Sequence, residues 1–231
     1  LTMIGKLKSS KRFEITLLLI LMTLFCFSLS LFRYYISETK VFLFLNWNLF
    51  LAWIPFFISS FLVIFKIRSK LSLVVAITVW ILFFPNSPYI LTDLFHLRNR
   101  NSIPIWYDLV VILSYAWTGL FCGFVSLLDI EKLLSDYCRR SFINIMTISF
   151  LFITSFGVYL GRFLRWNSWD ILSNPFGLFN DILLRIVYPT NHIQTWGVTV
   201  FMGVMLNFMY FMMKSVRNLN RPTFAIKNQQ T

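Results

Sequence analysis

Long apolar runs alternate with short polar or charged segments along this 231-residue chain. Runs of about 20 apolar residues match the length of helix that crosses a ~30 Å hydrocarbon core. The pattern predicts an all-α, polytopic membrane protein with six transmembrane helices in a single domain over residues 1–231. Within the fourth run, Gly119 and Gly123 form a G-x-x-x-G pair, which predicts close packing against another helix. We expect the spans at about residues 15–32, 49–65, 71–84, 109–128, 142–160 and 193–213.

The third run is short and ends at a proline-rich segment. Residues 71–84 would span only about 21 Å at 1.5 Å per residue, which is less than the hydrocarbon core. Pro85 and Pro88 follow, and a proline disfavours the α conformation in the residue before it. We expect Ser87 to act as the N-cap and Pro88 to begin an amphipathic, interfacial segment over about residues 88–98. The third helix is thus predicted to be broken by proline, with free backbone N–H groups at the start of its second half.

Two further segments lie between or beyond the spans. The first, about residues 175–188, follows Asn174 and Pro175, residue types favoured at the N-cap and first position of a helix. Its apolar and polar residues fall on opposite sides, which is typical of a helix lying in the membrane interface. The second is a polar, basic tail over residues 214–231. The first run follows four cations like a signal peptide, but it is long and lacks a cleavage site, so we expect it to be retained.

Composition supports a membrane protein. The chain is 58% hydrophobic and 13% charged, with a mean hydropathy of +0.71, more apolar surface than a soluble domain of this length could bury. A net charge of +12 is compatible with nucleic-acid binding. The cations, however, cluster at the ends of the apolar runs, so we expect no nucleic-acid partner and assign them to membrane lipids, with anionic headgroups on the cytoplasmic side.

The distribution of Lys and Arg predicts the topology. Fourteen of these residues lie in the two terminal segments and in the loops after spans two and four, and seven lie in the remaining loops. Because cytoplasmic loops carry an excess of cations, both termini are predicted to be cytoplasmic. The proline-rich segment and residues 161–192 would then face outward.

The proline-rich segment carries the first group of candidate functional residues. Tyr89, Asp93, His96 and Arg100 are spaced four, three and four apart, which places them on one face of a helix. An acid, an imidazole and a cation would therefore line one side of this segment.

A second group follows the fifth span. If that helix continues, Arg162, Arg165, Trp166 and Trp169 share a face. Two guanidinium groups beside two tryptophans suit a phosphate-bearing headgroup at the membrane surface. The full candidate polar cluster, which is either a structural network or an anionic-headgroup site, is Tyr89, Asp93, His96, Arg100, Asp108, Arg162, Arg165, Trp166, Trp169 and Asp170.

Three segments of the chain are similar to a known family. Residues 84–97 read FPNSPYILTDLFHL, residues 106–108 read WYD, and residues 161–170 read GRFLRWNSWD. They resemble a bacterial family of predicted integral membrane proteins that is known only as a domain of unknown function. The resemblance implies a multi-pass protein of the bacterial cytoplasmic membrane. It implies no activity, substrate or catalytic residue.

A metal site is the first chemical interpretation of the cluster. Asp93 and His96 are weak candidate ligands, and Asp108, Asp170 or His192 would have to complete the shell. A single D-x-x-H pattern is common, and no second ligand pair accompanies it. We therefore expect no metal and no cofactor.

A structural network is the simpler interpretation. An unpaired charge at membrane depth costs about 2–3 kcal/mol on insertion scales, so pairing is expected on structural grounds alone. We predict that Asp93 and Asp108 pair with Arg162 or Arg165, and that Asp93, His96, Arg162 and Arg165 meet in one cluster.

Three functions remain open at this stage. The favoured one is a structural or lipid-interacting membrane component. The first alternative is a membrane-embedded enzyme acting on a phosphate-bearing lipid or a lipid-linked envelope precursor at the outer leaflet, and the second is a small transporter. Transport is disfavoured because we place every acid at a span end or in a loop, including a solvated connection over residues 129–141. The sequence specifies neither a catalytic residue nor a protein partner.

The topology can be tested by labelling. Cysteines introduced at Asn101 and Asn191 should react with a membrane-impermeant thiol reagent in intact cells, because both positions lie in loops predicted to face outward. A cysteine introduced at Ser69 should react only after the membrane is permeabilised. Labelling at Ser69 with no labelling at the other two positions would reverse the orientation.

Overall fold

The computed structural model describes residues 12–67, 69–98 and 103–219, and its regular elements in these ranges are helices. Six of them are long and apolar enough to cross a membrane, so the predicted all-α fold with six candidate spans is confirmed. The long helices are α2 (Phe13–Ser37), α3 (Phe44–Phe65), α4 (Lys70–Phe83), α6 (Ile105–Leu134), α7 (Arg140–Phe163) and α10 (Ile193–Leu219). The short ones are α5 (Asn86–Tyr89), η1 (Ile90–His96), α8 (Asp170–Ser173), α9 (Pro175–Val187) and η2 (Pro189–His192).

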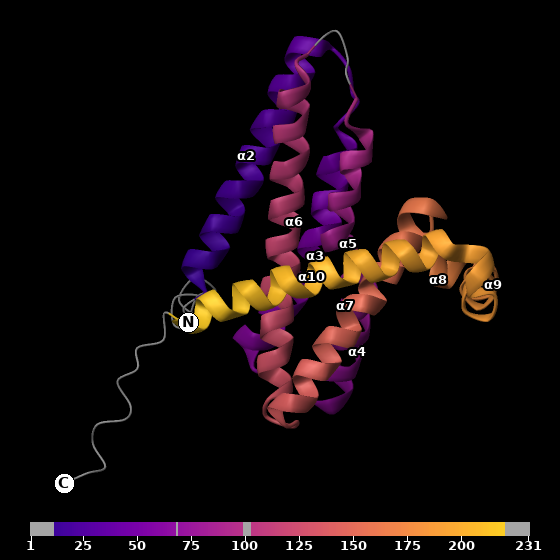
Figure 1. The fold of residues 1–231 in the computed structure, drawn as a ribbon. Coiled ribbons are helices and arrows are strands. Elements are labelled where there is room, and N and C mark those ends of the chain that lie inside the picture. The colour runs from indigo at the N-terminus through magenta and orange to yellow at the C-terminus, as the bar shows by residue number, and fades with distance from the viewer. Residues whose placement is uncertain (1–11, 68, 99–102, 220–231) are drawn as a thin grey trace.

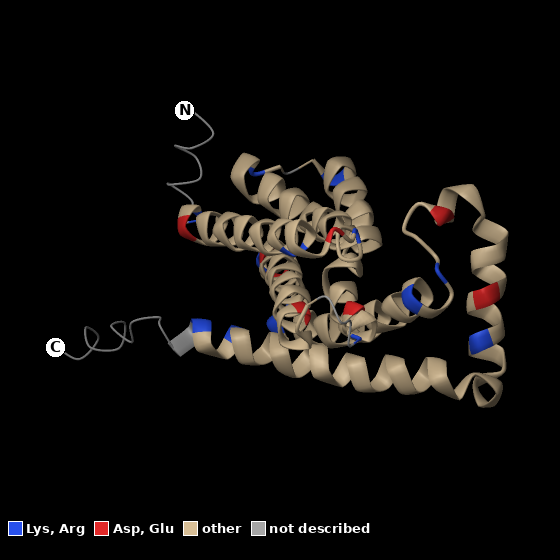
Figure 2. Ribbon diagram, turned by 90° about the horizontal axis from the view of Figure 1, so that it is seen from above, with Lys and Arg blue, Asp and Glu red and all other residues tan. Residues whose placement is uncertain are grey.

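Helix α6 is the centre of the bundle. It packs against α2, α3, α5 and η1, and its buried side chains contribute to both apolar cores. Helix α10 packs mainly on α7 and crosses in front of the other helices rather than running beside them (Figure 1). Viewed from above, long stretches of helix carry no charge, and α10 is charged only near its carboxyl end (Figure 2).

The proline-rich segment interrupts the third helix, although its backbone stays close to helical. Helix α4 ends at Phe83, and α5 begins at Asn86. Phe84 and Pro85 have right-handed helical backbone angles, with φ of −56° and −59°. The Phe84 N–H donates to the Trp80 carbonyl at 2.9 Å, and the Ser87 N–H donates to the Phe84 carbonyl at 3.0 Å. Residues Lys70–His96 therefore form one candidate span of 27 residues. The predicted break is present between α4 and α5. The predicted free N–H groups are wrong for Ser87 and Tyr89, because the Tyr89 N–H also has a partner, the Pro85 carbonyl at 3.0 Å.

Ser87 has a different role from the predicted N-cap. Its hydroxyl is buried and donates to the Ala52 carbonyl of α3 at 3.2 Å. Residues before proline disfavour the helical conformation only as a bias, and here the contacts of α5 with α3, α6 and α7 outweigh it. The third span thereby reaches the length that the apolar run alone lacked.

Asp129 and Glu131 lie inside α6, not in a solvated connection. Arg12 Nη2 lies 2.7 Å from Asp129 Oδ2, and Lys214 Nζ lies 2.6 Å from Glu131 Oε2. Helix α6 extends past its apolar run because both acids form ion pairs, with Arg12 before α2 and with Lys214 of α10. The prediction of a solvated loop over residues 129–141 was therefore wrong for its first part.

The two glycines of α6 permit the close approach of α5. A Cβ atom on Gly119 would lie 2.8 Å from Ile90 Cδ1 and 3.0 Å from the Ser87 carbonyl oxygen. A Cβ atom on Gly123 would lie 2.7 Å from Ser87 Cβ. The predicted packing role of the G-x-x-x-G pair is confirmed, and its partner is the proline-rich segment.

Gly123→Ala should destabilise the protein by about 1–3 kcal/mol, since the added methyl group would displace Ser87 and the helix that carries it. Gly197→Ala is the matched control, because a Cβ there would meet no atom within 4 Å. Unfolding in mixed micelles, followed by circular dichroism, would measure both. Equal stabilities for the two variants would contradict this packing.

Candidate functional site

Four polar residues from two α-helices and one 3-10 helix meet at one end of the bundle. The Asp93 carboxylate is 1% exposed; its Oδ1 lies 3.1 Å from Arg162 Nη1, and its Oδ2 accepts a hydrogen bond from Asn48 Nδ2 at 2.8 Å. Arg162 Nη2 lies 2.9 Å from His96 Nδ1. We term Asn48, Asp93, His96 and Arg162 the Asp93 cluster. The predicted pairing of Asp93 with Arg162 is confirmed, although 69 positions separate them.

The local backbone explains how the cluster assembles. Segment η1 is a 3-10 helix, in which residues three apart lie on the same side, so Asp93 and His96 both face Arg162. Arg162 lies in the last turn of α7. A guanidinium group only donates hydrogen bonds, so His96 Nδ1 accepts and its neutral tautomer carries the proton on Nε2. The cluster then holds one carboxylate and one guanidinium and has no net charge.

Arg165 does not join this cluster. Helix α7 ends at Phe163, and Arg165 has a left-handed φ of 62° and an exposed side chain. The predicted shared face of Arg162 with Arg165 is therefore wrong. Trp166, in the following loop, donates from Nε1 to Asp181 of α9 at 2.8 Å, and Trp169 is 43% exposed.

Asp108 is paired elsewhere. Its carboxylate accepts from Arg33 Nε at 2.7 Å and from Arg33 Nη2 at 3.2 Å, and both residues are buried. The predicted partner, Arg162 or Arg165, was wrong, because Arg33 is part of α2 rather than of a loop. Arg33 also donates to Ser37 and Thr39, so this pair joins the end of α2 to the start of α6.

Asp170 holds a turn. Its carboxylate accepts from the Asn167 backbone N–H at 2.7 Å and from the Ser173 hydroxyl at 3.0 Å. These hydrogen bonds, that of the Asn167 backbone first, lower the pKa of Asp170. It therefore stays ionised at neutral pH and shapes the chain before α9. Arg100, the remaining residue of the predicted stripe, lies outside the described residues.

The predicted helix over residues 175–188 is present as α9. The side chain of Asn174 caps it by accepting from the Gly177 N–H at 3.1 Å, and Pro175 is its first residue. Phe176 and Phe179 are 86% and 63% exposed. This apolar surface is the pattern that led to the prediction of an interfacial helix.

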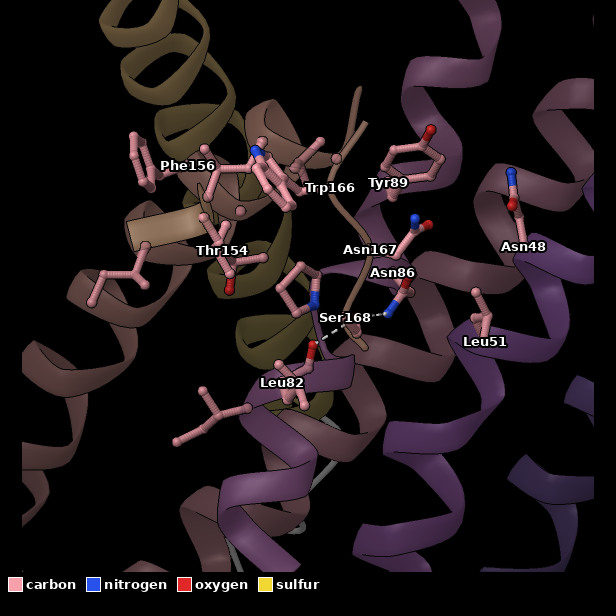
Figure 3. A pocket seen from close by; sticks show the side chains of 18 of the residues that line it. Asn48, Leu51, Leu82, Asn86, Tyr89, Thr154, Phe156, Trp166, Asn167 and Ser168 are labelled. Atoms are coloured by element: carbon pink, nitrogen blue, oxygen red, sulfur yellow. Dashed lines mark hydrogen bonds between the residues drawn. The ribbon is translucent and has the colours of Figure 1, made fainter. Parts of the chain in front are cut away.

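A cavity of about 350 Å³ adjoins the cluster, and Asn48 belongs to both. Its walls come from α3, the α4–α5 segment, α7 and α9, and the loop over residues 166–168 runs across it (Figure 3). Asn86 Nδ2 donates to Ser168 Oγ at 3.1 Å, and Ser168 donates to the Leu82 carbonyl at 3.0 Å, which fixes this loop to the third span. The polar side chains at the cavity are Asn48, Asn86, Tyr89, Thr154, Trp166, Asn167 and Ser168, and the other lining residues are apolar or glycine.

Thr154, in the cavity wall, has a buried hydroxyl group without a hydrogen-bond partner among the described residues. Its side chain is 1% exposed. A helical threonine usually bonds the carbonyl one turn earlier, and a buried hydroxyl without a partner costs about 1–3 kcal/mol. The hydroxyl oxygen itself is buried, so a molecule inside the cavity would reach it only after a small shift of the wall.

The cavity opens toward the outside of the bundle. Trp47, Ile81 and Ile153 contribute to its rim, and they are 55%, 47% and 64% exposed. In a multi-pass membrane protein, exposed apolar residues on spanning helices contact acyl chains. The opening is thus lateral, toward lipid.

Sequence reasoning missed most of this cavity. Asn86 and Ser168 lie inside the conspicuous motifs, so their positions were a usable signal. Thr154 and Asn48 carry no such signal, because isolated polar residues in apolar runs are common. Within the described ranges, no three His, Cys, Asp or Glu side chains gather where they could hold a metal ion.

The chain was compared with known proteins. A family model described as "Protein of unknown function (DUF1361)" matches residues 47–209, a range that contains the Asp93 cluster and the cavity. No curated protein and no solved structure matches the chain.

Asp93→Asn should destabilise the protein strongly, because Arg162 would keep its charge without a carboxylate. Breaking a buried pair costs about 3–5 kcal/mol, and we expect the lower end because the Arg162 side chain is 13% exposed. Adding Arg162→Gln to Asp93→Asn should cost little more, since the two changes remove one interaction. Unfolding in mixed micelles would measure the cycle, with the exposed Asp136→Asn as control. Strictly additive losses would contradict the pairing.

Proposed function

We propose that this chain, which belongs to the family of proteins of unknown function DUF1361, is a lipid-binding membrane protein. Its cavity beside the Asp93 cluster would take part of one amphipathic molecule from the bilayer. The observation that carries the proposal is a cavity that opens toward lipid and whose described lining residues are apolar or uncharged polar. A volume of about 350 Å³ is within the range of small-molecule sites.

The chemistry of the walls indicates which part of the molecule would enter. Among the described residues that line the cavity, none is charged, and the neighbouring Asp93 and Arg162 neutralise each other. Apolar walls favour a hydrocarbon chain, and the amides of Asn48, Asn86 and Asn167 both donate and accept hydrogen bonds. The molecule would place a chain and an uncharged polar group, such as an ester, amide or hydroxyl, inside.

The location follows from the charge distribution. The excess of Lys and Arg in the terminal segments and alternate loops supports an orientation with both termini in the cytoplasm, and the resemblance of the motifs to a bacterial family implies a bacterial cytoplasmic membrane. The cavity would then lie in the outer leaflet, with α9 in the interface beside it. The exposed Phe176 and Phe179 of α9 support that placement.

Binding is favoured over turnover of a phosphate-bearing lipid. The cation assigned to phosphate from the sequence, Arg162, already contacts Asp93 and His96. Arg165, the intended second cation, is on a different part of the backbone. The cluster is therefore better suited to holding η1 against α7 than to holding a phosphate.

Thr154→Val should separate binding from folding. The change keeps the side-chain shape and removes a hydroxyl that has no protein partner, so thermal stability should be unchanged or slightly higher. Lipid that copurifies with the protein, measured by native mass spectrometry, should fall several-fold. We expect this loss because a small shift of the wall would bring the Thr154 hydroxyl to the polar group of the bound molecule.

Substitutions that fill the cavity with a larger side chain provide a second test of lipid binding. Ile182→Trp adds bulk to a lining residue of α9, whereas Leu183→Trp adds it to the next residue, which is 44% exposed and does not line the cavity. The first change should displace the copurified lipid, and the second should retain it. Equal lipid content in wild type and all three variants would overturn the proposal.

A further inference from the structure

A second hollow lies between α3 and α4, at the end of the bundle that contains Asp129. It has a volume of about 500 Å³ and is lined by side chains that include Phe57, Phe61, Phe65, Ala76 and Val79. We term it the α3–α4 groove. Its phenylalanines are 44–57% exposed, so the groove is open on the lipid-facing side of both helices.

Ser60 is the one polar residue of the groove, and it contacts a cation. Arg12 Nη2 donates to Ser60 Oγ at 2.8 Å and lies 2.7 Å from Asp129 Oδ2. Arg12 is 7% exposed, and its Nη1 has no hydrogen-bond partner among the described residues. The buried guanidinium group of Arg12 therefore lies behind Ser60, the polar residue of this apolar groove.

Two lysines flank the groove at the turn between its helices. Lys66 caps α3 in the left-handed conformation directly after Phe65, and Lys70 is the first residue of α4. Both are exposed, and the sequence adds Arg68 between them. Asp129 is the acid that faces Arg12, so cations exceed acids around this groove.

We propose that the α3–α4 groove binds an anionic glycerophospholipid. One acyl chain would lie against the phenylalanines, and the phosphate would meet Lys66 and Lys70. Long lysine side chains extend along apolar surface to place their charge at headgroup level, which suits this arrangement. The site is separate from the cavity beside the Asp93 cluster, because its residues and its charge differ.

Charge and shape can be tested independently on the full-length protein in detergent. Phosphatidylglycerol and phosphatidylcholine with identical chains would be titrated and their occupancies read by native mass spectrometry. Phosphatidylglycerol should bind more tightly, and Lys66→Gln with Lys70→Gln should reduce its affinity by about fivefold per lysine while leaving phosphatidylcholine unchanged. Lys40→Gln is the matched control, since this exposed lysine lies beyond the far end of α2.

The apolar part has its own pair of variants. Ala76→Phe should fill the groove and reduce the affinity of both lipids, whereas Val74→Phe, at a 63% exposed position of α4 outside the groove, should not. Thermal unfolding would show that each variant folds. Equal affinity for the two lipids, or unchanged binding in Ala76→Phe, would identify ordinary boundary lipid and overturn the proposal. Thr154→Val should leave this binding intact, which separates the groove from the cavity.

Discussion

Buried charge is the constraint on which this structure depends. An ionised group inside a membrane protein is tolerated only with a partner, because the surrounding medium cannot solvate it. Helix α6 supplies three such acids, Asp108, Asp129 and Glu131, which pair with cations on α2, before α2 and on α10. The most apolar chain segments are thus joined at their ends by a small number of ion pairs, and α6 is the helix that most of them share.

The same constraint shapes the site. Asp93 and Arg162 join η1 to α7, and once paired they leave the adjoining cavity without net charge. Close packing also positions the cavity wall. The glycines of α6 let the proline-rich segment approach, and this segment contributes Asn86 and Tyr89 to the cavity. A neutral cavity lies at one end and a cation-flanked groove at the other. Their chemistry differs because opposite charges are balanced at the first and unbalanced at the second.

Helix α9 shows how loosely one part of this arrangement is joined. Two tryptophan indoles hold this helix. Trp166 donates to the Asp181 carboxylate, and Trp196 donates to the Arg185 carbonyl at 3.1 Å. The apolar side of α9 contributes Leu178 and Ile182 to the cavity and leaves Phe176 and Phe179 exposed. An amphipathic helix with this division of contacts covers the cavity without being buried by the bundle. A few polar bonds therefore fix α9 beside the cavity.

Local properties were readable without a structure. Hydropathy located the six helices, the pair Asn174–Pro175 marked the start of α9, and the need to neutralise Asp93 predicted Arg162 across a long separation. The other outcomes depended on distances between helices. Asp108 pairs with Arg33 because α2 is longer than its apolar run and includes this arginine. Arg165 lies outside the Asp93 cluster because α7 ends at Phe163. The regular third helix ended at Phe83, as the prolines predicted, but the residues beyond it stayed helical because packing of α5 against α3 and α6 outweighed a pre-proline bias of the backbone. Most of the cavity had no sequence signature, since its walls come from separate segments of the chain that only tertiary packing brings together.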